Sequence, residues 1–503
     1  MKVAPKGSPA GVLEFGSSAT RTRQVKAGRA LRLAPGIYAM DASLPPEAVA
    51  RHHCLAVVAR VWPGAVISDR SAFSGGRPAE GWLFIRHPDP ARRSNLRLPG
   101  ITISVEDGPG ALPGDMPMPH GLHLSGVARG LVENVTSPGP APTGRPARAA
   151  GTEATEEQMD ALARDGGPGR IRNVLGELDL IKGSFGRPAV EAVRRRLAEL
   201  LGTHTDSAPL SPRLRARLEG EPFDAARLAL IERLVAGLGT IPPEPAPAIG
   251  GPGQWEWLPF FEAYFSNYIE GTEFTVEEAL RIAVDNEIPA SRPQDAHDVA
   301  ATYRIVSDPQ LAAHRARSGA ELLDILREHH ATLMAARPEK RPGLLKQKRN
   351  WAGGYQFVEP ELLVGTLTRG FDLLAPVTDP LHRAVTVMFL VTECHPFDDG
   401  NGRVARIVAN SELSAAGQIR LIVPTVYRSN YLAGLAGASN GAGRGESLTA
   451  VLRFTQRWVA GIDWRTFDAA DAEIRETNGY LDPVRAENAA QRLRLPGSVP
   501  EVE

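Results

Sequence analysis

The sequence predicts a mainly α-helical protein in which an α+β region precedes a helical domain. Apolar residues recur at helical spacing in residues 187–202 and 224–239, and after residue 254 almost every stretch has a helical pattern. Before residue 137, by contrast, short apolar runs bounded by Gly or Pro are typical of strands. These runs are CLAVVARVW at 54–62 and GWLFIRH at 81–87.

Two stretches rich in Pro, Gly and Ala divide the chain. They lie at 137–154 and 241–254, and their composition favours the extended, weakly packed backbone of connectors. With 503 residues, the chain is also too long for a single hydrophobic core. We therefore expect an α+β region at 1–136, a helical region at 155–240, a helical domain at 255–465 and a C-terminal tail at 466–503.

The composition excludes several classes of protein. Hydrophobic residues make up 43% and charged residues 23%, with a formal net charge of -1, which is typical of folded domains rather than disordered chains. Cys54 and Cys394 are the only cysteines, too few for a disulfide framework or a cysteine-based zinc site. Signs of a signal peptide or of a membrane span of about eighteen apolar residues are lacking. We expect a cytoplasmic protein.

One short stretch gathers most of the chemistry. Residues 395–406 have the sequence HPFDDGNGRVAR and lie between two predicted helices, 379–394 and 403–417. Gly400 and Gly402 let the backbone approach a ligand closely, and the free amide groups that open the second helix carry partial positive charge. The loop is therefore an expected anion site.

Four side chains equip this loop for a transfer reaction. Arg403 and Arg406, three residues apart, share a helix face and offer planar donors to phosphate oxygens. Asp399 suits a hard divalent cation, which one or two carboxylates and water usually hold. His395 is the side chain there that can take up a proton near neutral pH. Together they favour transfer from a nucleotide to a hydroxyl group.

These residues match the signature of the Fic family, His-x-Phe-x-Asp/Glu-Gly-Asn-Gly-Arg-x-x-Arg, at every signature position. A lone His-Pro or Asn-Gly would be an ordinary helix end or turn, but the eight constrained positions together are far more specific. The resemblance implies an all-helical core with a small β-hairpin flap. It also implies transfer of AMP from ATP to a Ser, Thr or Tyr hydroxyl of a protein, the chain itself included, with release of pyrophosphate.

The resemblance assigns a role to each residue of the loop. His395 would take the proton from the attacking hydroxyl, Asp399 would hold Mg²⁺, and Phe397 would be a buried wedge that anchors the loop. Gly400, Asn401 and Gly402 would form the anion hole, and Arg403 and Arg406 would hold the β- and γ-phosphates. Doc-type toxins, which resemble this sequence but transfer phosphate, carry Lys in place of the second glycine and lack the last arginine. Gly402 and Arg406 therefore favour attack at the α-phosphate.

A second stretch, FSNYIEGTEF at 265–274, resembles the inhibitory motif of the family, Ser/Thr-x-x-x-Glu-Gly/Asn, through Ser266, Glu270 and Gly271. On a helix Ser266 and Glu270 face the same way, and Gly271 is a natural helix stop. The resemblance implies that Glu270 pairs with Arg406 and places negative charge where three phosphates would sit. We expect an enzyme held off by default. The alternative is a solvated glutamate that ends an amphipathic helix.

Two weaker features accompany this motif. Residues 344–360 lie where the family has its flap, with Gly353 and Gly354 at the turn, although an ordinary connecting hairpin is the alternative. Tyr427 and Tyr431 are candidates either for an adenine pocket or for helix packing.

The N-terminal region indicates a separate activity. Residues 17–40 carry five basic and no acidic residues and end in a PGIY turn that enters a strand. With later patches, up to about residue 200, they resemble the winged-helix and following domain of abortive-infection-type antitoxins, which bind their own promoters. DNA is therefore an expected partner, and a solvated basic face on a protein-binding domain is the alternative. The basic residues are Arg21, Arg23, Lys26, Arg29 and Arg32.

Three functions remain open on the sequence alone. The leading one is an autoinhibited protein adenylyltransferase with an N-terminal sensing or DNA-binding module. The others are a transcriptional regulator or toxin-antitoxin component whose Fic domain senses nucleotide, and an enzyme that removes AMP with Glu270 orienting a water. An intact His395 favours an enzyme, because nucleotide binding alone needs no base. ATP, Mg²⁺, a protein target with a hydroxyl side chain and a second copy of the chain are the expected partners.

Overall fold

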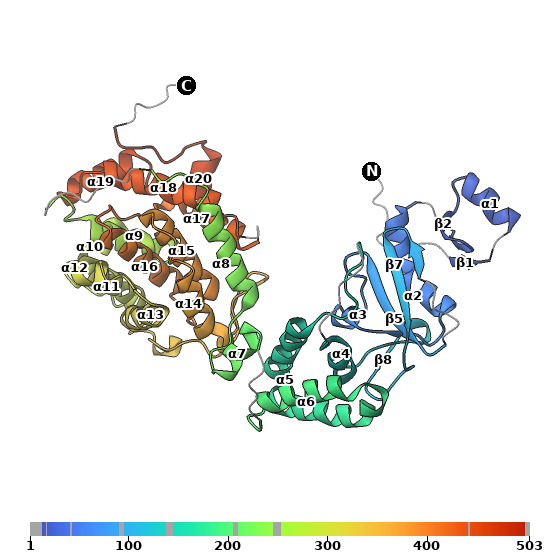
Figure 1. Cartoon of the computed structure of the whole chain (residues 1–503). Helices are drawn as coiled ribbons and strands as arrows, with labels where there is room; N and C mark the ends of the chain where they lie inside the picture. The colour runs from blue at the N-terminus through green and yellow to red at the C-terminus, as the bar shows by residue number, and fades with distance from the viewer. Residues whose placement is uncertain are drawn as a thin grey trace. The chain divides into compact units, whose positions relative to one another are not determined.

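The protein has two compact units, residues 1–219 and 220–503 (Figure 1). The computed structural model describes residues 13–16, 18–40, 43–89, 95–136, 144–204, 210–244, 253–440 and 443–497. Within these ranges no helix combines the length and the apolar character that a bilayer crossing requires.

The first unit is built on two sheets. A three-stranded antiparallel sheet has the order β1-β3-β2, and a six-stranded mixed sheet has the order β6-β7-β5-β4-β9-β8. The strands are β1 (Leu13–Phe15), β2 (Leu31–Ala34), β3 (Ile37–Ala39), β4 (Val66–Ile67), β5 (Trp82–His87), β6 (Leu96–Leu98), β7 (Ile101–Asp107), β8 (Met116–Met118) and β9 (Leu122–Leu124). The helices are α1 (Ala19–Lys26), α2 (Pro46–Val61), α3 (Arg70–Phe73), α4 (Val127–Asn134), α5 (Thr152–Ile181), α6 (Arg187–Leu200) and α7 (Pro212–Leu218), with short 3-10 turns η2 (Pro119–Gly121) and η3 (Lys182–Ser184).

One of the two predicted strands is instead a helix. GWLFIRH forms β5 as expected, but CLAVVARVW lies in α2, which starts at Pro46 and buries one apolar face. A continuous apolar run fits a buried helix as well as a strand, and the length of the segment favours the helix. The buried residues recur three to four apart, at Val49, Ala50, Cys54, Val57 and Val58.

Part of the predicted first connector is fastened to the larger sheet. The stretch 137–143 lies outside the described residues, but Arg145 and Arg148 follow it and make specific contacts. Arg145 Nη2 donates to Ser104 Oγ at 3.2 Å, and Arg148 Nη2 donates to the Ile85 carbonyl at 2.5 Å. Guanidinium groups offer several donors in one plane, so two arginines hold backbone that composition alone predicts to be loosely packed.

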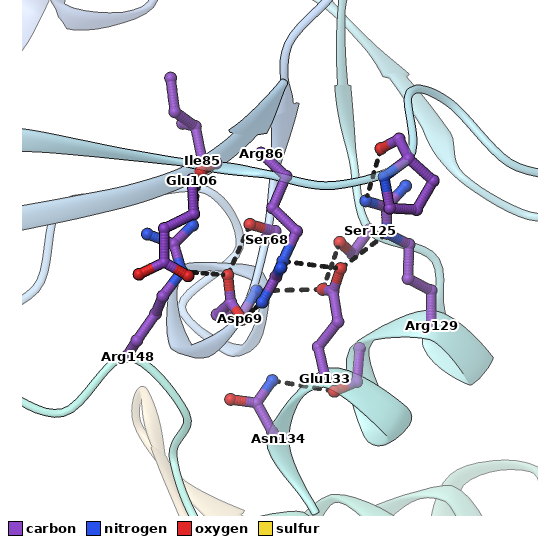
Figure 2. A network of polar contacts seen from close by, with 12 residues as sticks. Ser68, Asp69, Ile85, Arg86, Glu106, Ser125, Arg129, Glu133, Asn134 and Arg148 are labelled. Carbon is purple, nitrogen blue, oxygen red and sulfur yellow. Dashed lines mark hydrogen bonds and ion pairs between the residues drawn. The ribbon is translucent and has the colours of Figure 1, made fainter. Parts of the chain in front are cut away.

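A buried network of charges lies against this sheet (Figure 2). Asp69 is 1% exposed and accepts hydrogen bonds from Arg86 Nη2 at 2.7 Å and Arg148 Nε at 2.9 Å. Its main-chain N–H donates to Glu133 Oε2 at 3.1 Å, and Arg129 Nε donates to Glu133 Oε1 at 2.8 Å. Asp69 also has φ 54° and ψ -140°, a conformation that residues other than glycine rarely adopt. The ion pairs hold this strained backbone in place.

The second unit is almost entirely helical. Its helices are α8 (Ala225–Leu238), α9 (Leu258–Ile269), α10 (Val276–Ala283), α11 (Pro293–Ser307), α12 (Pro309–Ala312), α13 (Gly319–Leu333), α14 (Leu363–Asp372), α15 (Pro380–Cys394), α16 (Asn401–Ala415), α17 (Arg428–Asn440), α18 (Glu446–Gly461), α19 (Phe467–Glu476) and α20 (Pro483–Asn488). A two-stranded hairpin, β10 (Trp351–Ala352) and β11 (Tyr355–Gln356), is its only sheet among the residues described, and 3-10 turns are η4 (Pro338–Lys340), η5 (Pro360–Leu362) and η6 (Thr425–Tyr427). The hairpin turns at Gly353 and Gly354, as predicted.

Helix α15 forms the centre of this unit. Its apolar residues are buried on every side, which is the pattern of a helix inside a core rather than on a surface. It packs against α16, α14, α8 and α18. The two helices predicted on either side of the motif are thus confirmed, and they meet at the loop 395–400.

The observed boundaries differ from the predicted ones at two places. Helix α8, expected with 155–240, lies in the second unit, where Ile231 and Leu234 join the core around α15. The expected C-terminal tail contains α19 and α20, whose buried Ile474 and Ala486 join an aromatic core with Trp458. In both cases an apolar helix face needs a core to cover it, and composition does not show which core that is.

The charge network predicts a large effect of one substitution in the first unit. Asp69→Asn removes the carboxylate that faces Arg86 and Arg148, so we expect the free energy of unfolding to fall by about 3 kcal/mol. Urea unfolding with hydrogen exchange of β5 and β7 measures this change. Asp179→Asn, which removes an exposed partner of Arg194, is the matched control and should leave exchange unchanged. Equal stabilities of the two variants would contradict this account.

Candidate active site

His395 lies where the buried helix α15 ends. It caps the helix in a left-handed conformation, φ 50° and ψ 62°, and its N–H donates to the Val391 carbonyl at 2.9 Å. Its Nδ1 is 3.3 Å from the Thr392 carbonyl. A carbonyl only accepts, so Nδ1 carries the ring hydrogen and Nε2 is left with a free lone pair. The ring also stacks on Phe357, with centroids 3.9 Å apart.

The surroundings of His395 keep the imidazole neutral. Burial lowers the pKa of His395 to about 4, although the contact with the Thr392 carbonyl opposes this shift. At neutral pH the ring is therefore uncharged and can accept a proton at Nε2.

Phe397 anchors the loop from inside the core. It is fully buried and stacks on His330 of α13, with ring centroids 3.8 Å apart. His330 Nδ1 accepts from the Gly343 N–H at 2.9 Å, so its Nε2 carries the hydrogen and donates to the Asp399 carbonyl at 3.2 Å. His330, whose sequence neighbourhood gives no sign of this position, thus holds both the ring and the backbone of the loop.

Both signature glycines stand where a side chain does not fit. Gly400 caps α16 with φ 72°, and a Cβ there would lie 3.1 Å from Met334 Sδ. A Cβ on Gly402 would lie 2.2 Å from Glu270 Oε1, far inside van der Waals contact. Glu270 therefore lies directly against the first turn of α16, where free amide groups point outward.

The inhibitory motif meets the last arginine of the loop. Arg406 Nη2 donates to Glu270 Oε1 at 2.7 Å and to the Ser266 carbonyl at 2.8 Å, and Arg406 Nε donates to Ser266 Oγ at 3.0 Å. Helix α9 ends at Ile269, and Gly271 follows with φ 88°. Sequence analysis predicted this pairing, and the structure brings the residues together. The Nε and Nη2 donors of Arg406 are thus occupied by the protein itself.

Two of the predicted phosphate ligands have other partners. Arg403 is 3% exposed, and its Nη1 lies 2.8 Å from Asp298 Oδ2 and 3.3 Å from Asn267 Oδ1. The Asn401 side chain brackets Phe397, accepting from its N–H and donating to its carbonyl, both at 2.9 Å. The sequence assigned both residues to phosphate binding, and for Arg403 it does not reveal the buried acceptors that come from α9 and α11.

Asp399 is the loop carboxylate that fits a metal ion. Partial burial would raise its pKa, but the Gly400 N–H and the charges of Arg403 and Lys340 lower it below the ordinary value, so the group is ionised. Lys340 Nζ lies 3.3 Å from Asp399 Oδ2. Among the described residues, no cluster of three or more His, Cys, Asp or Glu side chains is arranged to hold a metal ion. A single carboxylate suits Mg²⁺ that arrives with phosphates, because this ion keeps most of its water.

His395 and the inhibitory ion pair open onto one cavity of about 480 Å³. His395, Gly402, Arg406 and Glu270 contribute to its wall, and so does Tyr431, one of the two tyrosines proposed for a base pocket. Tyr427 instead stacks on Phe454. The cavity is large enough for a nucleotide and carries a base, a cation and outward-pointing amides on one side.

A second carboxylate in this wall is not apparent from the sequence. Glu393 is buried on α15 and pairs with Arg227 of α8. It also accepts hydrogen bonds from the Tyr355 hydroxyl of the hairpin and from Ser439 Oγ, the latter at 2.7 Å. Glu393 therefore connects the hairpin and α17 to the helix that carries His395. Its partners lie up to 166 residues away, beyond the reach of a local pattern.

Comparison with known proteins agrees with this geometry. Residues 322–413 match the model of the Fic/DOC family. Protein adenylyltransferase fic-1 from Caenorhabditis briggsae is 32% identical over 122 residues, which cover 24% of this chain and 24% of that protein. Protein adenylyltransferase Fic from Drosophila willistoni is 26% identical over 256 residues, 48% of this chain and 49% of that protein. The chain thus spans between a quarter and a half of the length of these relatives.

Solved structures give a weaker likeness. Fic-1 (residues 134–508) from C. elegans has a TM-score of 0.34 and 18% identity, and the match covers 68% of this chain and 94% of that one. The family model covers α13 to α16, the segment that carries the complete loop. Residues 322–413 of this chain are therefore similar to the Fic/DOC family.

Proposed function

We propose that this protein is an autoinhibited protein adenylyltransferase. It transfers AMP from ATP to a Ser, Thr or Tyr hydroxyl of a protein, its own chain included. The observation that carries the proposal is a neutral His395 in a cavity wall where Glu270 occupies Arg406. We place the protein in the cytoplasm, where ATP is abundant and unpaired thiols such as buried Cys54 and Cys394 persist.

The proposed reaction uses groups that already face the cavity. His395 Nε2 accepts the proton of the attacking hydroxyl while the hydroxyl oxygen forms a bond to the α-phosphorus of ATP. The bond from that phosphorus to the bridging oxygen breaks, and pyrophosphate leaves. Amide groups at the start of α16 and the guanidinium of Arg406 stabilise the phosphate charge. Mg²⁺, which Asp399 would hold, supplies further charge neutralisation when bound.

Glu270 opposes this reaction in two ways. It accepts a hydrogen bond from Arg406 Nη2 and neutralises the guanidinium charge, so a γ-phosphate must displace it to bind this cation. Its carboxylate also lies against Gly402, where a phosphate would approach the amides. The Glu270 carboxylate and a γ-phosphate are both anions, and they compete for the same cation, Arg406. Release of Glu270 is therefore the proposed point of control.

The first test removes this carboxylate. Glu270→Gly leaves Arg406 free for phosphate, so we expect ATP to bind about 10- to 100-fold more tightly, the range of a hydrogen bond to a charged group. Self-modification with labelled ATP should rise with it. Calorimetry measures the binding, and intact mass shows whether the added group is AMP.

Two matched variants accompany this test. Glu273→Gly removes an exposed carboxylate three residues away and should behave as the unaltered chain. His395→Ala, added to Glu270→Gly, should keep ATP binding but lose about 100- to 10,000-fold in rate, the usual contribution of a general base. An unchanged rate without His395, or no label in Glu270→Gly, would refute the proposed enzyme.

The pKa of His395 gives a second test. A base must be neutral to accept a proton, so activity disappears as pH falls through its pKa. Because burial lowers this pKa to about 4, the rate of Glu270→Gly should stay level down to about pH 5. Stopped reactions across the pH range, with folding followed by circular dichroism, show the midpoint. A midpoint near the ordinary histidine value of about 6.5 would contradict the buried, neutral base.

We also propose that the N-terminal part of the first unit binds DNA, as a winged-helix module would. Helix α1 buries none of its residues, and the hairpin β2-β3 follows it. Arg23, Lys26 and Arg29 are exposed on this segment, whereas Arg21 pairs with Glu14 at 2.7 Å. Three free cations on a surface helix and its end suit a phosphate backbone.

This second proposal has a salt-dependent signature. Arg23→Ala with Lys26→Ala should weaken binding of a fluorescent DNA duplex and reduce the slope of log affinity against log salt by about two. Arg187→Ala, which removes an exposed cation on α6, should leave both unchanged. If the double variant and Arg187→Ala show the same slope of log affinity against log salt, a protein-binding role for this surface is favoured.

A further inference from the structure

The loop that carries His395 has an unusual backbone requirement. Helix α15 ends inside the core, so the carbonyl groups of its last turn and of the loop lose both helical partners and water. His395 itself adopts φ 50°, which costs energy for a residue with a side chain. Something must hold this conformation and satisfy these carbonyls.

A single short segment meets this requirement. Lys346 Nζ donates to the Cys394 carbonyl at 3.0 Å, and the Lys346 main-chain N–H donates to the Pro396 carbonyl at 2.8 Å. Asn350 Nδ2 donates to the His395 carbonyl at 3.3 Å and to the Phe397 carbonyl at 3.2 Å. Four consecutive carbonyl groups are thus held by two residues that precede the hairpin.

The two residues also hold each other. Lys346 is 3% exposed, and its Nζ donates to Asn350 Oδ1 at 2.8 Å. Burial lowers the pKa of Lys346 to about 8, so the side chain still carries charge at neutral pH. A cation beside the last carbonyl of a helix is favourable, because the C-terminal end carries partial negative charge. The Asn350 amide is in turn oriented with its NH₂ toward the loop.

We infer that Lys346 and Asn350 are positioning residues, which fix the backbone of residues 394–397 so that His395 Nε2 faces the cavity. The inference rests on the proposed function. Neither residue lines the cavity, so they act through His395 rather than on a substrate.

The contacts predict which step depends on this segment. The Phe397 carbonyl has a second donor, Asn401 Nδ2, and the Asp399 carbonyl is held by His330. The turn that would bind phosphate therefore keeps its supports without Asn350. Among the residues that the structure describes, the only donor to the His395 carbonyl is Asn350. Loss of Asn350 should disturb the base and spare nucleotide binding.

The experiment uses the full chain with Glu270→Gly. Asn350→Asp keeps the shape of the side chain and the acceptor for Lys346 but removes the N–H donor. We expect the rate of self-modification at saturating ATP to fall about 10- to 100-fold, as for a misplaced catalytic group. The dissociation constant for ATP, measured by calorimetry, should stay within about twofold, because the lost interaction acts on the reacting step alone.

A second test variant, with two controls, keeps the test informative if Asn350→Asp folds poorly. Lys346→Met retains length and apolar volume but has no ammonium group, and it should show the same split between rate and ATP affinity. Gln347→Ala and Lys348→Met alter exposed neighbours on the same segment and should behave as the Glu270→Gly parent.

The outcomes separate this inference from the proposed function. An inactive Glu270→Gly parent refutes the function itself, and with it the basis for any positioning role. If the parent is active and neither Asn350→Asp nor Lys346→Met changes its rate, the positioning role is refuted and the proposed function stands. Rate, ATP affinity and melting temperature that fall together also overturn it, because they indicate general loss of structure.

Discussion

The second unit depends on one constraint: its most buried helix, α15, ends inside the protein. A helix that ends in water can leave its last carbonyls to the solvent, but α15 cannot. The chain answers with His395 in a left-handed conformation, with Phe397 stacked on His330, and with donors from residues 346 and 350. The same arrangement puts an imidazole at the edge of a cavity and opens α16 with free amides. Catalytic geometry and fold stability thus share the same hydrogen bonds.

The ion pair between Glu270 and Arg406 follows from this frame. Arg406 is almost fully buried, and a buried guanidinium needs an anion. When no phosphate is bound, Glu270 and the Ser266 carbonyl serve as its partners. The inhibitory contact therefore also neutralises a charge that would otherwise be costly to bury. Arg403, equally buried, pairs with Asp298 of α11 instead of with the inhibitory motif.

Sequence alone anticipated the parts of this structure that are local. The helices on either side of the motif and the Gly-Gly hairpin were predicted from local patterns. The contact between Glu270 and Arg406, which are 136 residues apart, was predicted only through the resemblance to the Fic inhibitory motif. The other partners that come from distant segments were not predicted. Asp298 for Arg403, Arg227 for Glu393 and Lys346 for the loop lie on other helices or turns, and no local pattern marks them. The run at 54–62 was misassigned for a related reason, since burial on one side or on both is decided by the rest of the fold.

At Gly402, inhibition by Glu270 and phosphate binding by the helix amides depend on the same space. The space that a methyl group would need at this position is the space that Glu270 Oε1 occupies. Any larger residue would both expel the glutamate and crowd the amides meant for phosphate. A side chain at this position would therefore act on the glutamate and on the amides meant for phosphate at the same time. Substitutions that weaken the inhibition are therefore better tolerated in α9, where a change can loosen Glu270 and leave the phosphate-binding turn intact.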